Sequence, residues 1–142
     1  MKVGIVKKPK KLTYSKSKKA AWDAFSKYIR LRDCTDGVGD QAFGSCFTCG
    51  RRYEFKKLQA GHFLNGRHNS ILFDERGTHA QCKYCNIILK GNQVKYTLKM
   101  QEIYGQKVID ELIKLDTETR KYKIFELVLI KETYEQKYTN MV

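Results

Sequence analysis

The chain has 142 residues, of which 42% are hydrophobic, and it carries a formal net charge of +13 from 28 basic and 15 acidic residues. Its length suits one domain, and no segment reaches the roughly 18 consecutive apolar residues that a membrane span requires, so we expect no membrane partner. The basic N-terminus is not followed by an apolar run, which argues against a secretory signal and predicts a cytoplasmic protein with reduced cysteines.

The positive charge is concentrated at the N-terminus. Residues 1–32 contain eleven basic residues and one acidic residue, whereas residues 33–142 contain seventeen and fourteen. Residues 1–14 lack an apolar period and include the single proline of the chain, so we expect a flexible basic arm there. Such an arm binds polyanions by releasing their counterions. The alternative is a tail that only keeps the protein soluble.

A basic helix is expected after the arm. Ser15 or Ser17 can cap it, and it should end near Asp33. Its apolar stripe consists of Trp22, Phe25 and Ile29, which we interpret as core rather than as a platform for stacking bases. Two lysines on its other faces are candidate DNA contacts: Lys18 and Lys19. Residues 36–40 then form a loop.

Two Cys-x-x-Cys pairs are the strongest chemical signal in the chain: Cys46 with Cys49, and Cys82 with Cys85. Four thiolates in two such pairs predict one tetrahedral Zn²⁺ site. Because four cysteines close the ligand set, this zinc has no position for water and is expected to be structural. Cys34 lies outside both pairs, and we expect a small packed thiol there rather than a ligand.

The remaining chain alternates between strand and helix patterns. Residues 43–63 predict a β-hairpin whose turn carries the first cysteine pair. Residues 64–78 predict a long irregular loop, which in a compact domain is usually functional. From Lys83 the apolar period becomes helical and stops near Gly105, and a second helix should end near Asp116. Residues 122–138 fit helix or strand, and their length favours helix.

His62 and Asn86 are the candidate catalytic residues. His62 ends the second predicted strand, and a neutral imidazole can take a proton from water that attacks a phosphodiester. Asn86 directly follows the last cysteine of the quartet. Its amide oxygen is an acceptable ligand for Mg²⁺ or Mn²⁺, although asparagine is also a favoured helix cap.

The order of these elements resembles the HNH, or ββα-metal, nuclease superfamily and, more narrowly, the phage NinG/Rap recombination proteins. Four stretches carry the resemblance: AFSKYIRLRD at 24–33, QAGHF at 59–63, LFDER at 72–76, and QCKYCN at 81–86 with the Gly-Asn pair at 91–92. The resemblance implies a zinc-containing, divalent-metal-dependent endonuclease that acts on Holliday junctions and D-loops in the host cytoplasm. It makes His62 the general base and Asn86 a metal ligand.

Two positions depart from the superfamily pattern. Gly61 stands where many HNH enzymes have a His or Asp metal ligand, and Gly77 stands where the central Asn would fall. Without that Asn, we expect a looser loop behind the base. His79 or Asp74 could supply a missing ligand for the catalytic metal, or His79 could simply pack beside the zinc site.

We therefore predict one α+β domain over residues 15–142. It comprises a basic N-terminal helix, a zinc-bridged HNH-like ββα core at about 42–105 and a helical extension at about 106–142. A homodimer paired through the C-terminal helices would match the two-fold symmetry of a junction, and recombination proteins would be further partners. Basic residues around the core are candidate DNA contacts, although each could equally be a solvated charge: Arg67, His68, Arg76, Lys83 and Lys90.

Three other functions compete with a junction nuclease. A non-catalytic zinc module could bind recombination DNA, and Gly61 with Gly77 would suit it. An HNH enzyme of the homing or restriction kind would cut linear duplex DNA at a sequence. An RNA-binding zinc protein would use the basic arm and the nine tyrosines of the chain.

Overall fold

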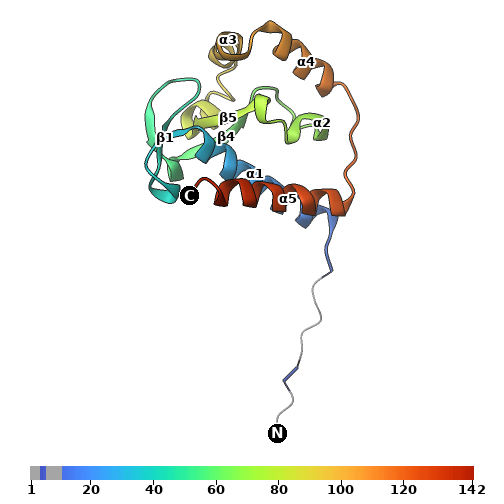
Figure 1. Cartoon of the computed structure of the whole chain (residues 1–142). Helices are drawn as coiled ribbons and strands as arrows, with labels where there is room; N and C mark the ends of the chain where they lie inside the picture. Colours follow the sequence, from blue (N-terminus) through green and yellow to red (C-terminus); the bar gives the residue numbers. More distant parts are fainter. Residues whose placement is uncertain (1–3, 6–10) are drawn as a thin grey trace.

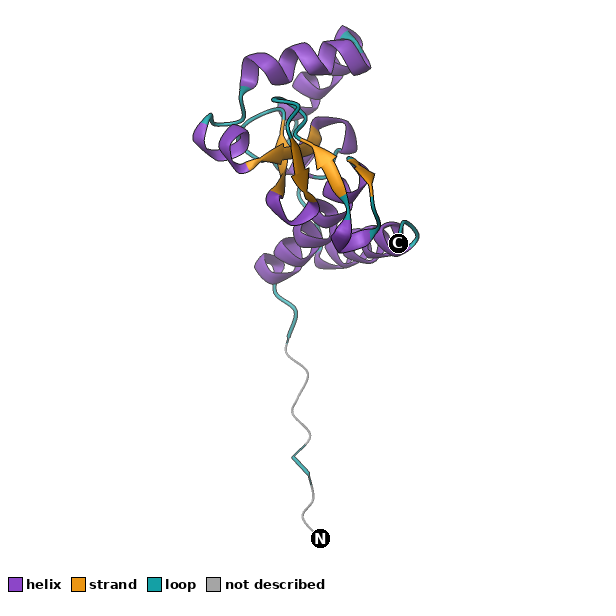
Figure 2. Ribbon diagram, turned by 90° about the vertical axis from the view of Figure 1, so that its left-hand side faces the viewer, coloured by secondary structure: helices purple, strands orange, loops and turns teal. Residues whose placement is uncertain are grey.

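The computed structural model describes residues 4–5 and 11–142, so most of the predicted basic arm, including Lys2, Lys7, Lys8 and Lys10, lies outside the described residues. The described chain is a mixed α+β structure (Figures 1 and 2). Its helices are α1 (Tyr14–Arg32), α2 (Asn69–Leu72), α3 (Gln93–Tyr104), α4 (Gln106–Asp116) and α5 (Ile124–Thr139), with a π-helical turn, η4 (Tyr84–Ile88). Its strands are β1 (Cys34–Asp36), β2 (Phe43–Ser45), β3 (Arg52–Glu54), β4 (Leu58–His62) and β5 (Thr78–Cys82).

The strands of the described residues form two small antiparallel sheets. The first has the order β1-β2-β3, and the second pairs β4 with β5 from Leu58 opposite Cys82 to His62 opposite Thr78. The prediction of a single hairpin over 43–63 is correct only for β2 and β3, which flank the first cysteine pair. A short 3-10 turn, η2 (Phe55–Lys57), separates β3 from β4. β4 therefore pairs with a strand that follows the predicted loop.

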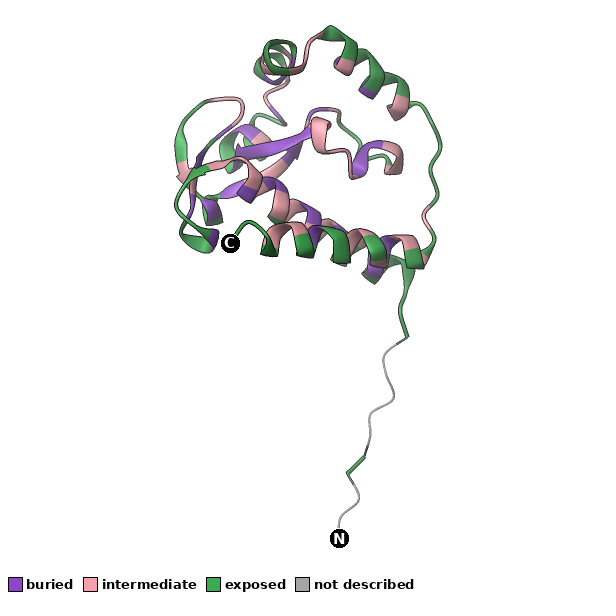
Figure 3. Cartoon of the chain, in the orientation of Figure 1, coloured by how far each residue is buried: buried purple, intermediate pink, exposed green. Residues whose placement is uncertain are grey.

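Helices cover both faces of the β4–β5 sheet. α1 and α5 lie side by side on one face, and α3 and α4 lie beyond the other (Figure 1). The α1–α5 layer buries Phe25, Ile29 and Tyr134, against which Ala60 of β4 packs. The opposite layer contains Tyr96 and Leu112. Strand β5 between them is buried along its whole length, as its purple ribbon in Figure 3 shows.

An ion pair joins the end of α1 to the buried strand. Arg32 donates one hydrogen bond to the carbonyl oxygen of Glu75 at 2.8 Å and another to that of Thr78 at 2.7 Å. Asp33 pairs with Arg32 and accepts a hydrogen bond from the backbone N–H of Ala80 at 2.8 Å. Hydrogen bonds with a charged partner are stronger than neutral ones. This contact therefore anchors the end of α1 to β5.

Several predicted element boundaries differ from the structure. Thr13, not Ser15 or Ser17, caps α1, because its hydroxyl accepts from the backbone N–H of Lys16. The helix predicted from Lys83 to Gly105 is divided, since η4 ends before Asn92 adopts a left-handed backbone and α3 begins. The predicted loop contains α2. The two C-terminal helices are confirmed as α4 and α5.

The C-terminal helices pack within the chain. Leu112 of α4 and Leu127 of α5 are both fully buried. The helical extension therefore contributes to the core of the chain, while pairing of two chains through the C-terminal helices stays a prediction. None of the helices in the described residues is long and apolar enough to span a membrane.

We expect Asp33→Ala to lower the free energy of unfolding by about 2 kcal/mol, because it removes a charged acceptor and leaves the Ala80 N–H without its partner. The matched control is Asp23→Ala on the same helix, whose exposed pair with Lys19 should contribute less than about 0.5 kcal/mol. Urea denaturation of the zinc-loaded proteins measures both changes. If both substitutions lower the free energy of unfolding by the same small amount, the contact of Asp33 does not anchor α1.

Candidate metal centre and active site

Four cysteine sulfurs from three separate segments meet in one cluster. Cys46 and Cys49 come from the turn between β2 and β3, Cys82 from the end of β5 and Cys85 from η4. Their sulfur atoms all lie within 4.8 Å of one another. A tetrahedral ZnS₄ unit with bonds of about 2.3 Å has sulfurs about 3.8 Å apart, and the Cys49–Cys82 separation is 3.9 Å. The quartet can therefore hold a metal ion such as zinc.

Hydrogen-bond donors around the quartet favour a thiolate at Cys46, whereas burial raises the pKa of Cys49 and of Cys85. The backbone N–H of Cys85 points at the sulfur of Cys82 at 3.4 Å, and the side-chain amide of Asn92 donates to the sulfur of Cys85 at 3.6 Å. Burial acts to raise the pKa of Cys46, but hydrogen bonds from nearby backbone and Thr48 outweigh it and lower that pKa to about 6. Cys34 packs elsewhere, beside Leu31 and Phe55, as expected of a non-ligand.

His62 is held firmly at the end of β4. Its ring stacks on Trp22 of α1 with centroids 4.9 Å apart, and its Nε2 lies 3.2 Å from the carbonyl oxygen of Leu72. A carbonyl can only accept, so Nε2 carries the proton and Nδ1 of the neutral ring has the free lone pair. Burial, with a smaller contribution from Arg67, lowers the pKa of His62. The imidazole is therefore neutral at pH 7 and keeps a lone pair on Nδ1.

Asn86 is oriented by a neighbour on β4. Its side-chain Nδ2 donates to Oε1 of Gln59 at 2.9 Å, and this hydrogen bond determines which end of the amide is free. Oδ1 of Asn86 is left as an available neutral oxygen near Gly61. Because Asn86 follows Cys85 in η4, a metal ion in the quartet would fix its backbone position.

His62 and Asn86 line the same open cavity, which has a volume of about 490 Å³. Trp22 of α1 forms part of its wall, and Arg67 and Lys90 contribute positive charge. Arg67 lies over the Trp22 ring, with its guanidinium carbon 4.5 Å from the ring centroid. Three distant segments of the chain therefore build one basic, aromatic cavity around a neutral histidine.

The two basic residues of this cavity have strained backbones. Arg67 has φ +50° and Lys90 has φ +51°, in the left-handed region that side chains other than glycine rarely adopt. Such conformations cost on the order of 1–3 kcal/mol each and are concentrated at functional sites. Both residues line the cavity with His62 and Asn86, so the positive charge at this cavity comes from residues with left-handed backbones.

Gly61 leaves no room for a ligand before His62. A Cβ at this position would collide with Oε1 of Gln81 and lie 3.0 Å from Oδ1 of Asn86. The Gln81 amide is itself fixed, because its Nε2 donates to Thr48 and to the carbonyl oxygen of Gly91. The departure from the HNH pattern at Gly61 therefore has a steric cause. The loop behind His62 contacts it through the Leu72 carbonyl oxygen described above, and the expectation of a looser loop stays a prediction.

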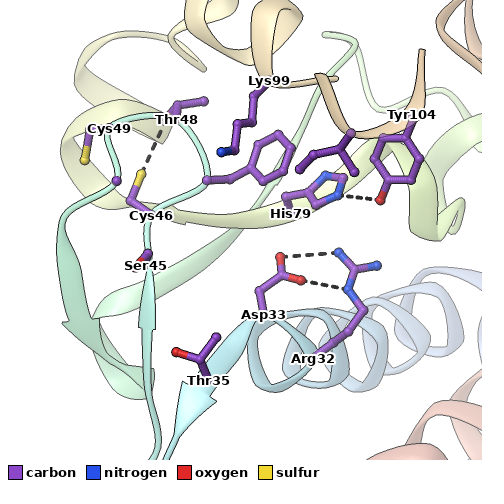
Figure 4. Close-up of a pocket in the computed structure, with 13 residues that line it drawn as sticks. Arg32, Asp33, Thr35, Ser45, Cys46, Thr48, Cys49, His79, Lys99 and Tyr104 are labelled. Carbon is purple, nitrogen blue, oxygen red and sulfur yellow. Dashed lines mark hydrogen bonds and ion pairs between the residues drawn. The ribbon is translucent and has the colours of Figure 1, made fainter. Parts of the chain in front are cut away.

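The structure does not bring His79 or Asp74 to this cavity. Residues 61 and 79 are paired, so His79 lies on the opposite face of the sheet from His62. Its ring stacks on Phe47 at 3.9 Å and bonds to the Tyr104 hydroxyl, beside a second cavity of about 760 Å³ (Figure 4). Burial lowers its pKa to about 4. Asp74 pairs with Arg76 at 2.9 Å. Neither residue is placed to complete a metal site with Asn86.

The predicted DNA contacts divide into two groups. Lys18 and Lys19 line a neighbouring cavity that shares Trp22 and Arg67 with the first, and exposed Lys83 precedes η4. Three of the candidates are paired with acidic side chains of the chain: Arg76 with Asp74 and Glu111, His68 with Asp116 at 2.7 Å, and Lys19 with Asp23 at 2.7 Å. A role in DNA contact stays a prediction for each of them.

Trp22 and Gln59 are functional candidates that the sequence did not reveal. Trp22 was expected in the core, yet it is half-buried. The His62 ring stacks on its ring, and the Arg67 guanidinium lies over the same ring. Its position in the apolar stripe is no different from that of a core residue. Gln59 acts through Asn86, and no spacing rule could indicate it.

The family model described as Bacteriophage Lambda NinG protein matches residues 5–141. This chain belongs to the NinG family. It is similar to Protein ninG of Escherichia phage 933W, with 30% identity over 124 residues that cover 87% of this chain and 57% of that protein. Protein ninG of Escherichia phage lambda is 30% identical and that of Salmonella phage P22 is 31% identical, each over 87% of this chain and 56% of the relative.

This NinG-family chain spans a little over half the length of the curated relatives that it matches. No solved structure matches it. The relatives carry only the name Protein ninG, so the chemistry of the site has to be argued from its own residues.

We expect the NinG-family chain to bind about one zinc ion, and Cys46→Ser to remove it together with cooperative unfolding, because three thiolates no longer close the site. Metal analysis of the purified protein, and the thiolate–cobalt absorption after Co²⁺ exchange, measure the loss. Cys34→Ser is the matched control and should retain both signals, since Cys34 is not in the quartet. Full zinc content in Cys46→Ser would contradict the assignment.

Proposed function

We propose that this NinG-family chain is a divalent-metal-dependent endonuclease that hydrolyses phosphodiesters in DNA, with a zinc-bridged HNH-like core. The observation that carries the proposal is the meeting of His62 and Asn86 in one basic cavity. They come from separate elements, 24 positions apart in the sequence. In each side chain one polar atom is engaged in a hydrogen bond, Nε2 of His62 and Nδ2 of Asn86, so that Nδ1 of His62 and Oδ1 of Asn86 are free.

The arrangement of elements supports an HNH-like core. β4 ends with His62, the antiparallel β5 returns beside it, and η4 then presents Asn86 to the same cavity. The resemblance implies the same order of elements: a hairpin that carries the base, followed by a helix that carries the metal ligand. The cysteine quartet lies at the junction of β5 and η4, so a bound zinc would stabilise the relative position of both catalytic residues.

His62 is suited to activate water. Nδ1 of its neutral ring can accept a proton from a water molecule as that water attacks phosphorus. The Leu72 carbonyl, which accepts from Nε2, stabilises the imidazolium that forms, and the Trp22 ring holds the imidazole plane in place. This role needs no further protein carboxylate to orient the ring.

Positive side chains at the rim would hold the DNA backbone. Arg67 and Lys90 can neutralise the phosphate that enters the cavity, and Lys18 and Lys19 extend the same surface along α1. Contacts of this kind position DNA without reading its sequence. Binding is therefore expected to weaken steeply with salt.

A catalytic Mg²⁺ or Mn²⁺ would depend on Asn86 for its protein ligand. Oδ1 of Asn86 is a suitable hard oxygen, and the described lining residues of the cavity include no Asp or Glu. Water and the phosphate oxygens of DNA would therefore complete the coordination. Such an ion, when bound, stabilises negative charge on the phosphate and on the leaving oxygen.

Branched recombination intermediates are the proposed substrates, on the basis of the resemblance to phage recombination nucleases. A homodimer would place two such cavities across a four-way junction with matching two-fold symmetry. Other recombination proteins are the proposed partners.

A non-catalytic, zinc-stabilised DNA-binding accessory protein is the second candidate. The cavity that lacks carboxylates and the steric exclusion of a ligand at Gly61 favour it. A nuclease that cuts linear duplex DNA would share all the catalytic residues, and only the choice of substrate separates it from a junction nuclease.

We expect His62→Ala to reduce cleavage of a labelled four-way junction by about 10²- to 10⁴-fold while binding is retained, because the general base is lost. Single-turnover assays with Mg²⁺ or Mn²⁺, on the junction and on a linear duplex of the same sequence, measure the effect. His68→Ala is the control, since His68 is paired with Asp116 outside the cavity. Junction binding without cleavage by the unmodified protein would support the accessory protein instead. Equal cleavage of both DNAs would favour the linear-duplex enzyme.

The pKa of His62 predicts the pH dependence of cleavage. Burial places this pKa below its ordinary value of 6.5, so the neutral, active form predominates throughout the range above 6.5. We expect the single-turnover rate to be nearly constant from about pH 7 to 8 and to fall only as the pH drops below about 6.5. A rate that still rises tenfold per pH unit between 7 and 8 would indicate a different base.

A further inference from the structure

The turn that carries Asn86 exposes several large apolar side chains to solvent. We define the apolar ridge as the four such residues of η4 and its end, which are between 41% and 61% exposed: Tyr84, Ile87, Ile88 and Leu89. Val94 and Leu98 are also exposed on the next helix, α3. Runs of exposed apolar residues destabilise a protein in water unless they serve an interaction.

The ridge cannot turn inward, because the residues between its members already face the protein. Cys85 is buried in the quartet, and Asn86 is bonded to Gln59. The wider π-helical turn is closed by a hydrogen bond from the N–H of Leu89 to the carbonyl oxygen of Tyr84 at 2.8 Å. π-helical turns of this kind occur frequently at functional sites. The ridge is therefore a rigid protrusion.

The charge around the ridge indicates the kind of partner. Residues 83–99 include four lysines and no acidic residue: Lys83, Lys90, Lys95 and Lys99. Lys99 is paired with Glu102, so the positive charge that this segment offers a partner comes from the other three. The surface is also continuous with the candidate active site, because Ile87 and Lys90 line the cavity that contains His62. A partner that is negatively charged and also presents apolar faces is a nucleic acid with unstacked bases.

We propose that the apolar ridge contacts unstacked DNA bases next to the phosphodiester in the cavity, and that this contact creates a preference for branched over linear DNA. The inference rests on the proposed function, whose substrate it specifies. In a linear duplex the bases are stacked, and inserting apolar side chains requires opening a base step. At a branch point that opening has already occurred, so the same contact forms without the unstacking cost.

The test is binding without cleavage. The zinc-loaded protein is titrated, without added Mg²⁺ or Mn²⁺, against a four-way junction and a linear duplex of matched sequence, each with 2-aminopurine at the branch position. The variant Tyr84→Ser/Ile88→Ser removes two ridge residues that do not line the cavity. The matched control is Phe125→Ser/Leu129→Ser. These two apolar side chains have similar exposure but belong to α5, a different helix from the ridge. Zinc content and thermal unfolding check that both variants fold.

We expect the ridge variant to lose roughly tenfold or more in junction affinity and to lose the 2-aminopurine signal, with duplex affinity changed less than about twofold. The control should keep the affinities of the unmodified protein. Equal affinity of the unmodified protein for both DNAs, or an unchanged preference in the ridge variant, would overturn the proposal. Conversion of a dimer to a monomer by the ridge substitutions, measured by light scattering, would instead identify a contact with a second copy. If junction binding depends on the ridge but the cleavage assay with Mg²⁺ or Mn²⁺ shows no cleavage, the proposed nuclease activity is wrong and the proposed role of the ridge stands.

Discussion

The cysteine quartet is the constraint on which the rest of this structure depends. It joins the turn after β2 to the end of β5, two points that are separated by 32 residues between Cys49 and Cys82. A metal ion held there would offset the chain entropy of closing that loop, which a small domain with short strands offsets only weakly by other contacts. The part of the candidate cavity that is built by β4 to η4 lies between or beside these ligands, while Trp22 of α1 reaches it from outside them.

A second contact completes the candidate site from outside the cysteine quartet. Arg32 and Asp33 attach the end of α1 to β5, and α1 in turn carries Trp22 against His62. His62, the proposed base, is thus positioned by a helix on one side and by the Leu72 carbonyl on the other. Because α5 packs along α1, the C-terminal extension stabilises this arrangement indirectly.

The cavity combines a neutral base, a neutral amide oxygen and strained basic residues. Its positive charge comes from Arg67 and Lys90, whose left-handed backbones cost free energy that the surrounding fold has to supply. The described lining residues around His62 include no carboxylate, so in the proposed reaction the substrate supplies the negative charge. The exposed apolar residues of η4 are a second unfavourable feature beside the first, and in the proposed complex both would be stabilised by DNA with open bases.

Local spacing along the sequence is sufficient to predict several features of this protein. The cysteine pairs, the periods of α1, α4 and α5, and the positions of His62 and Asn86 all follow from residues a few places apart. That residues 78–82 form a buried strand depends on the tertiary structure, because Thr-His-Ala-Gln-Cys has no apolar alternation and two of its polar groups bond to partners outside the strand. The Ala80 N–H donates to Asp33, and the Gln81 side-chain amide donates to the carbonyl oxygen of Gly91. The same holds for Trp22, His68, Arg76 and His79. Each role depends on a contact with a side chain between 25 and 48 positions away in the sequence, which no local pattern specifies.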